Sequence, residues 1–131
     1  MAIHKIAGII LKDRKFLGVK EEGLDLLITP GGRVEKGETA KQTLERELRE
    51  ELGVRLVSMK PFGIFNDKTH DGKEDLKLET YFAEIEGEPK PNSEIEKIFW
   101  ANSAFRNPGA ELSIPMKKYI IPKLLEMKLI D

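Results

Sequence analysis

The residues best suited to chemistry are glutamates gathered in one short segment. Four of them lie between Thr39 and Leu52: Glu45, Glu47, Glu50 and Glu51. Taken alone, such a run is more typical of a solvated helix face, because glutamate is a good helix former. The chemistry that it could do therefore depends on where the carboxylates point relative to the buried side of the helix.

Apolar residues of the same segment recur with helical spacing and define that buried side: Ala40, Leu44, Leu48 and Leu52. At about 100° per residue, Glu51, Glu47 and Glu50 lie about 20°, 60° and 120° from Leu44, on the side away from Leu48. The three carboxylates border the leucine stripe, and Glu51 lies almost within it. Like charges partly withdrawn from water are unfavourable unless a cation neutralises them or one of them takes up a proton. The spacing therefore indicates a divalent cation site.

The residue composition restricts which cation that site could hold. The chain has no cysteine and only two histidines, His4 and His70, which we expect at the surface or at strand ends. Zinc-thiolate and multi-histidine sites are therefore excluded. The remaining ligands are oxygen atoms, which favour Mg²⁺, with Mn²⁺ as a second possibility.

A glycine-rich entry precedes the helix, and the two together form a longer pattern. Pro30, Gly31 and Gly32 allow the backbone to approach a ligand closely, since glycine has no Cβ. From Gly32 to Val54 the sequence reads G-x5-E-x7-R-E-U-x-E-E-x-G-U, where U is a bulky aliphatic residue. The chain thereby resembles the Nudix hydrolase family at every position of that family's signature box. The flanking strands, the Pro-Gly-Gly entry and the stretch from Glu94 to Trp100 resemble the family as well.

The resemblance implies a Nudix fold, an α/β architecture in which a mixed β-sheet is sandwiched between α-helices, and it implies a set of metal ligands. These are Glu47, Glu50, Glu51 and the carbonyl of Gly31. Arg46 resembles the arginine that orients the box carboxylates, a role that Glu38 shares. A further carboxylate from outside the box is expected at Glu94, with Glu96 as the alternative. Ile28 stands where many members carry an aromatic residue, which bears on substrate packing.

The reaction implied by the resemblance is Mg²⁺-dependent hydrolysis of a nucleoside diphosphate linked to another group. We expect water to attack a phosphorus atom directly, assisted by Glu50, Glu47 or Glu94, without a covalent enzyme intermediate. The small size favours a MutT-like (d)NTP pyrophosphohydrolase, which releases a nucleoside monophosphate and pyrophosphate. The alternatives are a pyrophosphatase for nucleotide sugars or other NDP derivatives, a catalytically silent nucleotide-sensing module, and a structural protein whose glutamates are only solvated.

Contacts to the nucleotide base have several candidates, although aromatic residues on strands are more often core and asparagines more often serve in loops or caps. The candidates are Phe62, Phe65, Tyr81, Phe82, Phe105, Asn102 and Asn107.

Elements that must position these residues follow from hydrophobic periodicity and turn signals. We expect strands over Ile3–Leu11, Lys15–Lys20, Val54–Phe65, Leu76–Ile85 and Glu96–Ala101. A helix is predicted up to Leu52, with a capping box formed by Thr39 and Gln42 and a left-handed cap at Gly53. A polar turn is expected over Asn66–Asp75. The apolar tail from Pro115 onward predicts a helix that is kinked or divided at Pro122, because proline disrupts a helix interior.

At the scale of the whole chain, the 131 residues predict one domain, 1–131, whose formal net charge is −1. That charge argues against binding of duplex nucleic acid, which needs a basic surface. The longest N-terminal apolar run, Ile6 to Leu11, is too short to cross a membrane. We therefore expect a cytoplasmic monomer or homodimer that acts on a small nucleotide.

Overall fold

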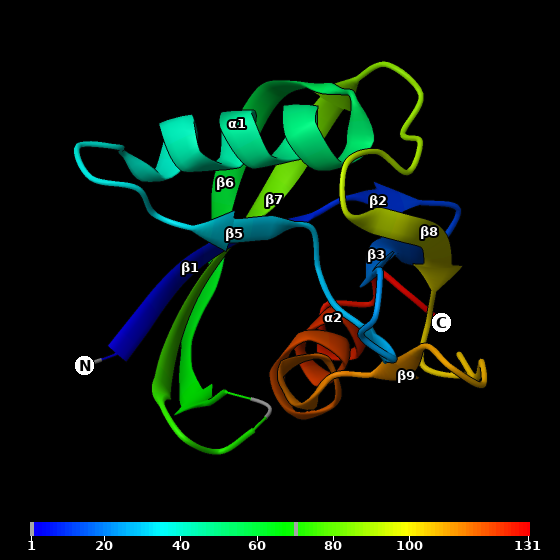
Figure 1. The fold of residues 1–131 in the computed structure, drawn as a ribbon. Coiled ribbons are helices and arrows are strands. Elements are labelled where there is room, and N and C mark those ends of the chain that lie inside the picture. Colours follow the sequence, from blue (N-terminus) through cyan, green and yellow to red (C-terminus); the bar gives the residue numbers. More distant parts are fainter. Residues whose placement is uncertain (1, 70) are drawn as a thin grey trace.

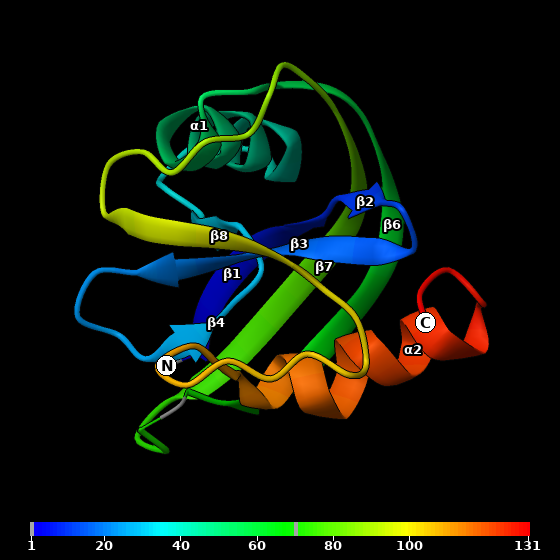
Figure 2. The same cartoon turned by 90° about the vertical axis from the view of Figure 1, so that its right-hand side faces the viewer.

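A computed structural model describes residues 2–69 and 71–131, so the expectation for His70 lies outside the described residues. In this structure, strands form a central layer with one helix above it and another below it (Figure 1). A view turned by 90° shows the same order of layers (Figure 2). The predicted α/β architecture, with sheets between helices, is confirmed.

The largest sheet has the strand order β5-β1-β7-β6. Its strands are β1 (Ala2–Ile9), β5 (Gly31–Arg33), β6 (Arg55–Lys68) and β7 (Asp75–Glu86). The pairing of β1 with β7 is parallel, whereas β1 with β5 and β6 with β7 are antiparallel, so the sheet is mixed. A second sheet has the order β2-β3-β8, with β2 (Leu11–Lys12), β3 (Lys15–Glu21) and β8 (Ile95–Ala101). The short strands β4 (Leu26–Leu27) and β9 (Glu111–Leu112) pair in parallel.

Helix α1 (Ala40–Leu52) begins and ends as its sequence predicts. The Thr39 hydroxyl accepts a hydrogen bond from the Gln42 N–H at 3.2 Å, and the Gln42 side chain accepts one from the Thr39 N–H at 2.9 Å. Gly53 adopts the left-handed conformation, with φ 67°, and its N–H donates to carbonyls of the last turn. The leucine stripe is fully buried and packs against Ile6 and Leu17, which fixes the rotation of the helix and the direction of its glutamates.

The C-terminal segment covers the opposite side of the strands (Figure 2). It forms a π-helical turn, η1 (Met116–Ile120), followed by α2 (Ile121–Glu126), in which Pro122 occupies the first turn. Proline is tolerated there because the first N–H groups of a helix have no partner within it. The change from π-helical to α-helical conformation lies between Ile120 and Ile121, one residue before Pro122, and the backbone stays helical through it. The expected division near Pro122 is therefore a change of helix type within one continuous helical segment.

Two predicted boundaries are wrong, and both depend on long-range pairing. The expected strand Ile3–Leu11 is divided, because the chain leaves the large sheet after Ile9 and Leu11 pairs with Phe16 in the second sheet. The expected polar turn Asn66–Asp75 is too long, because β6 continues to Lys68, which pairs with Asp75. No helix within the described residues combines the length and apolar character that a membrane span requires.

Candidate functional site

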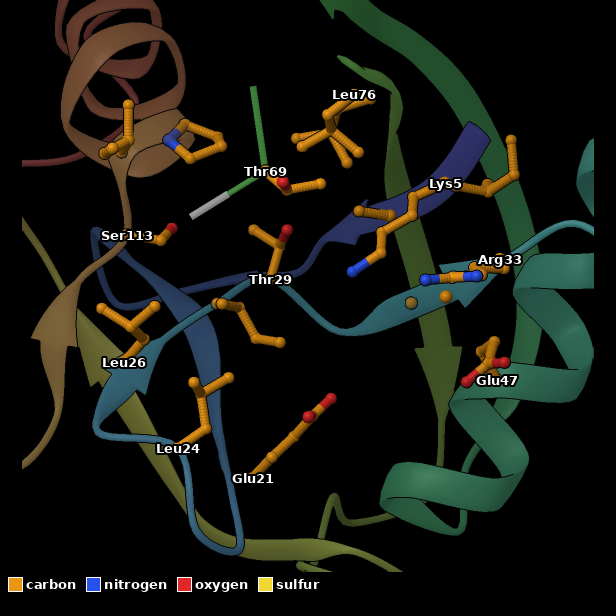
Figure 3. A pocket seen from close by; sticks show the side chains of 18 of the residues that line it. Lys5, Glu21, Leu24, Leu26, Thr29, Arg33, Glu47, Thr69, Leu76 and Ser113 are labelled. Carbon is orange, nitrogen blue, oxygen red and sulfur yellow. The ribbon is translucent and has the colours of Figure 1, made fainter. Parts of the chain in front are cut away.

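A cavity of about 370 Å³ lies between the large sheet, α1 and the segment that joins β3 to β5. Figure 3 shows side chains that line this cavity. Glu21 and Glu47 point into it from different sides, and the Lys5 ammonium faces it from β1. An aliphatic wall completes the cavity with Leu24, Leu26, Ile28, Leu76, Leu78, Ile114 and Pro115. The cavity therefore combines an acidic region, cationic side chains and an apolar surface.

Carboxylates from three parts of the chain form the acidic region: Glu21 at the end of β3, Glu47 and Glu51 on α1, and Glu94 just before β8. Oxygen atoms of Glu21, Glu51 and Glu94 lie within 4.8 Å of one another. Glu51 is only 1% exposed, Glu21 is half-buried and Glu94 is exposed. The helical wheel predicted the near-complete burial of Glu51.

Glu51 is anchored by the glycine-rich entry, since its Oε1 accepts a hydrogen bond from the Gly31 N–H at 2.9 Å. Burial raises the pKa of Glu51 to about 8, despite that hydrogen bond, and the charges of Glu47, Glu21 and Glu94 act in the same direction as burial. Gly31 has φ 148°, and a Cβ there would lie 2.0 Å from the Ile6 carbonyl oxygen. The backbone can therefore reach Glu51 at this point only because residue 31 is glycine.

Arg46 connects the helix to the loop that precedes it. Its Nε and Nη2 donate to both oxygens of Glu38, at 2.7 and 2.9 Å, and its Nη1 donates to Glu47 at 2.6 Å. The guanidinium lowers the pKa of Glu38 to about 2, and the hydrogen bond to Glu38 raises the pKa of Arg46. This is the arrangement that the resemblance implied: a rigid fork of donors holds Glu38 and orients Glu47.

On its other side, Glu47 lies close to the backbone of β5. Its carboxylate lies so close to Gly32 that a Cβ on that residue would be 2.5 Å from the carboxyl carbon. Burial raises the pKa of Glu47, against the effect of the hydrogen bond from Arg46. The second glycine of the entry thus leaves space for an ionisable group at the cavity wall.

The remaining predicted carboxylates separate into those that reach the cavity and those that do not. Glu94 reaches it, and hydrogen bonds from the Ser93 hydroxyl and its own backbone N–H lower its pKa. Glu96 lies elsewhere, since its carboxylate accepts a hydrogen bond from Lys20 Nζ at 2.5 Å. The Glu50 side chain is 50% exposed and lies 3.6 Å from Arg46 Nη1, outside the group around Glu51. Its wheel position, about 120° from Leu44, explains this exposure.

None of the five aromatic candidates lines this cavity in the described structure. Phe62 contacts Phe65 and Phe82 edge to face in the core next to α2, and Phe105 packs against Phe99. Tyr81 donates a hydrogen bond to Glu79. Among the polar candidates, Asn102 accepts from the Ala104 N–H at 2.9 Å, which is a loop role, and Asn107 lines a separate surface groove.

Sequence reasoning missed two of the cations that line the cavity, Lys5 and Arg33. Lys5 stands directly opposite Arg33 in the pairing of β1 with β5, and both line the cavity. Neither side chain has an ion-pair partner among residues 2–69 and 71–131. Like charges opposite each other destabilise a strand pair, so this pair is suited to an anionic ligand. Lys5 could have been found as a charged residue at an inward position of a strand.

The donor set fits a hard divalent cation. Oxygen atoms alone make up the acidic region, and within the described chain no lysine, arginine or histidine nitrogen forms an ion pair with Glu21, Glu51 or Glu94. One oxygen of the buried Glu51 is bound to Gly31, and its other oxygen has no hydrogen-bond partner in that part of the chain. Mg²⁺ and Mn²⁺ prefer this kind of surrounding.

One known protein family matches most of the chain. The family described as "NUDIX domain" matches residues 2–110. Nudix hydrolase YvcI of Bacillus subtilis, named as uncharacterized, is 26% identical over 103 residues, which are 75% of this chain and 65% of that protein. The 8-oxo-dGTP diphosphatase of Haemophilus influenzae is 44% identical over 57 residues, which are 40% of this chain and 42% of that protein. The chain thus spans less than two thirds of the length of these relatives.

Solved structures resemble the fold over nearly its whole length. The E. coli ORF135 protein has a TM-score of 0.76 at 25% identity, covering 97% of this chain and 91% of that chain. MutT NUDIX hydrolase from Burkholderia pseudomallei has a TM-score of 0.77 at 22% identity, covering 96% of this chain and 97% of that chain. These likenesses agree with the signature from Gly32 to Val54 and with the match over residues 2–110. The chain belongs to the Nudix hydrolase family.

Proposed function

We propose that this protein is a Mg²⁺-dependent hydrolase that cleaves a phosphoanhydride bond in a nucleoside diphosphate linked to another group. The observation that carries the proposal is the composition of one cavity. Glu47, Glu51 and Glu94 line one region of it, whereas Lys5 and Arg33 face it from the large sheet. A phosphate chain needs both a metal-binding acidic region and cations for its remaining charge.

The roles of the acidic residues follow from their positions. Glu47, Glu51 and the Gly31 carbonyl would hold the metal, with Glu50 as a further ligand on the ground of the resemblance. Bound Mg²⁺ would offset the negative charge of the phosphates and make a coordinated water more acidic. Glu47 and Glu94 both face the cavity, so either can accept the proton of the attacking water. Arg46 would keep the Glu47 carboxylate in position through the hydrogen bond at 2.6 Å.

The preferred substrate in this proposal is a (d)NTP, cleaved to a nucleoside monophosphate and pyrophosphate. The aliphatic wall from Leu24 to Ile28 and at Leu76 and Leu78 offers an apolar surface for the base and sugar. The 44% identity to the 8-oxo-dGTP diphosphatase over 57 residues supports this choice.

A second candidate is a pyrophosphatase that acts on nucleotide sugars or related NDP derivatives. A UDP-X diphosphatase shares the fold, with a TM-score of 0.77 at 20% identity. The hydroxyls of Thr29 and Ser113 also line the cavity and could hydrogen-bond a sugar. A catalytically silent sensing module would bind the same nucleotides without turnover.

The experiment that tests these candidates is a substrate panel. Purified protein with Mg²⁺ is incubated with nucleoside triphosphates, 8-oxo-dGTP, nucleotide sugars, ADP-ribose and dinucleoside polyphosphates, and products are separated by ion-exchange chromatography. We expect monophosphate and pyrophosphate from a triphosphate, and a loss of about 100-fold or more in kcat for Glu51→Gln. Glu45→Gln removes the same charge from an exposed position on α1 and should retain full activity. Binding without turnover of any compound would favour the sensing module.

A further inference from the structure

Glu21 lies outside the signature box, yet its carboxylate meets the buried glutamate of that box. It ends β3, well before Gly32 in the chain. Its carboxylate and those of Glu51 and Glu94 have oxygen atoms within 4.8 Å of one another. Figure 3 shows the Glu21 side chain extended into the cavity with its carboxylate inward.

An irregularity in strand pairing sets this direction. Lys20 pairs with Lys97, but the next residue, Glu21, pairs with Ile95, so Glu96 is an extra residue on β8. Such a bulge changes the direction of the side chains beside it, and bulges recur next to functional sites. The Glu22 N–H also donates to the Glu94 carbonyl at 2.8 Å. The backbones that carry Glu21 and Glu94 are therefore fixed to each other.

The lysine that precedes Glu21 in the sequence forms its bonds elsewhere. Lys20 Nζ donates to Glu96 at 2.5 Å and to the backbone carbonyl of Glu21 at 3.3 Å. Within residues 2–69 and 71–131, no side-chain cation pairs with the carboxylate of Glu21, Glu51 or Glu94. Glu51 is 1% exposed, and Gly31 binds one of its two oxygens. The other oxygen has no partner in that part of the chain and is not sealed from the cavity, so it is free to bind a ligand there.

We propose that Glu21 is a metal-ligating residue, so that the divalent cation is bound jointly by β3, α1 and the segment before β8. This proposal rests on the proposed function for the presence of a metal. It adds Glu21 as a ligand, which belongs neither to the signature box nor to the stretch that begins at Glu94. The bulge at Glu96 is then the feature that makes β3 part of the metal site. Glu22, one residue further, is exposed and does not line the cavity.

The test compares Glu21→Gln with Glu22→Gln, which makes the same change of charge at the adjacent exposed position. Mn²⁺ serves as the probe, and its binding is measured by titration calorimetry and by electron paramagnetic resonance of free Mn²⁺. We expect the dissociation constant for Mn²⁺ to rise about 10-fold or more in Glu21→Gln and to stay near that of the unaltered protein in Glu22→Gln. Equal Mn²⁺ affinity in the two variants and the unaltered protein would overturn the proposal.

Thermal unfolding without metal provides a second measurement that separates ligation from structural support. Removing one of several like charges should leave the melting temperature of Glu21→Gln equal to or above that of the unaltered protein. A lower melting temperature would assign Glu21 a structural role and overturn the proposal. Glu21→Lys should likewise fold and lose Mn²⁺ binding, because a fixed cation then occupies the position.

The comparison of Glu21→Gln with Glu22→Gln and the test of nucleotide hydrolysis can fail separately. Intact Mn²⁺ binding by the unaltered protein without turnover of any nucleotide would refute the proposed reaction, while the comparison at Glu21 would still be decisive. Absence of Mn²⁺ binding by the unaltered protein would refute both.

Discussion

The buried carboxylate of Glu51 makes the stability of the metal-free protein depend on pH in an unusual direction. Its pKa is raised from 4.5 to about 8 in the folded protein, because burial disfavours the charged form. Between these values the folded protein holds a proton that the unfolded chain has lost, so the free energy of unfolding should fall as the pH rises from about 4.5 to about 8. One pKa unit corresponds to about 1.4 kcal/mol, which makes the effect measurable by urea unfolding.

Glu51→Gln is the variant that isolates this effect, since its amide does not titrate. The difference in unfolding free energy between the two proteins should change steadily across that pH range and become constant above it. Saturating Mg²⁺ should remove most of the dependence in the unaltered protein, because a bound cation favours the ionised carboxylate. The same pH dependence in both proteins would contradict the assignment to Glu51.

Lys5 gives a prediction about substrate binding. It is half-buried, faces the cavity and stands opposite Arg33, so its ammonium is available to a phosphate oxygen. A hydrogen bond to a charged group contributes about 1.5–3 kcal/mol, so Lys5→Met should raise the KM for a nucleoside triphosphate about tenfold or more while largely preserving kcat. Steady-state kinetics provide the measurement. Lys60→Met removes a charge from an exposed position outside the cavity and should leave KM unchanged.

Some positions of the site glutamates could be predicted from the sequence and others could not. Burial of Glu51 follows from helical geometry, because the leucine period and the glutamate lie on one local element. The bond from Arg46 to Glu47 agrees with what the family resemblance implies. Glu50, which the wheel places at the border of the buried stripe, is more exposed than the expected ligand role requires. The place of Glu21 depends on the pairing of β3 with β8 and on one extra residue in β8. Nothing in the sequence distinguishes Glu21 from Glu22, since non-local pairing decides which of them faces the cavity.

At the scale of elements, the short strand β5 connects the large sheet to α1. Its first residue, Gly31, pairs with Ala7 on β1 and donates to Glu51 on α1. Gly31→Ala should reduce the free energy of unfolding by about 3 kcal/mol. The added methyl group would overlap the Ile6 carbonyl oxygen, and alanine would be strained at this backbone conformation. Gly23 also has a positive φ, 78°, but has open space around it, so Gly23→Ala should cost about 1 kcal/mol. Urea unfolding of the two variants measures the difference, and equal losses would contradict the steric argument.

Elements differ in how well the sequence predicts them. Helix α1 was predicted to the residue because its leucine period, the Thr39 cap and Gly53 are local signals. The separation of β1 from β2 and the extension of β6 to Lys68 were not predicted, because they are set by partner strands far away in the chain. Hydrophobic patterns indicate that a strand exists, whereas its ends depend on which residues find a partner.

At the scale of the whole molecule, the nearly even charge hides an uneven distribution. The net charge is −1, and four carboxylates line a single cavity. We expect no saturable binding of duplex DNA at physiological salt, because binding of that kind requires a basic surface that releases counterions. Fluorescence anisotropy of a labelled duplex measures this, with a triphosphate analogue as the positive control for the cavity. A salt-sensitive rise in anisotropy would contradict the prediction.

The convergence of Glu21, Glu51 and Glu94 has a consequence for the lifetime of the folded chain. A cation bound to all three would act as a reversible cross-link between segments that are far apart in the sequence. Such a link cannot exist in the unfolded chain, so metal binding would slow local opening of β3 away from α1. Resistance to proteolysis would then report the supply of divalent cations, and the protein would persist longest where those cations are plentiful.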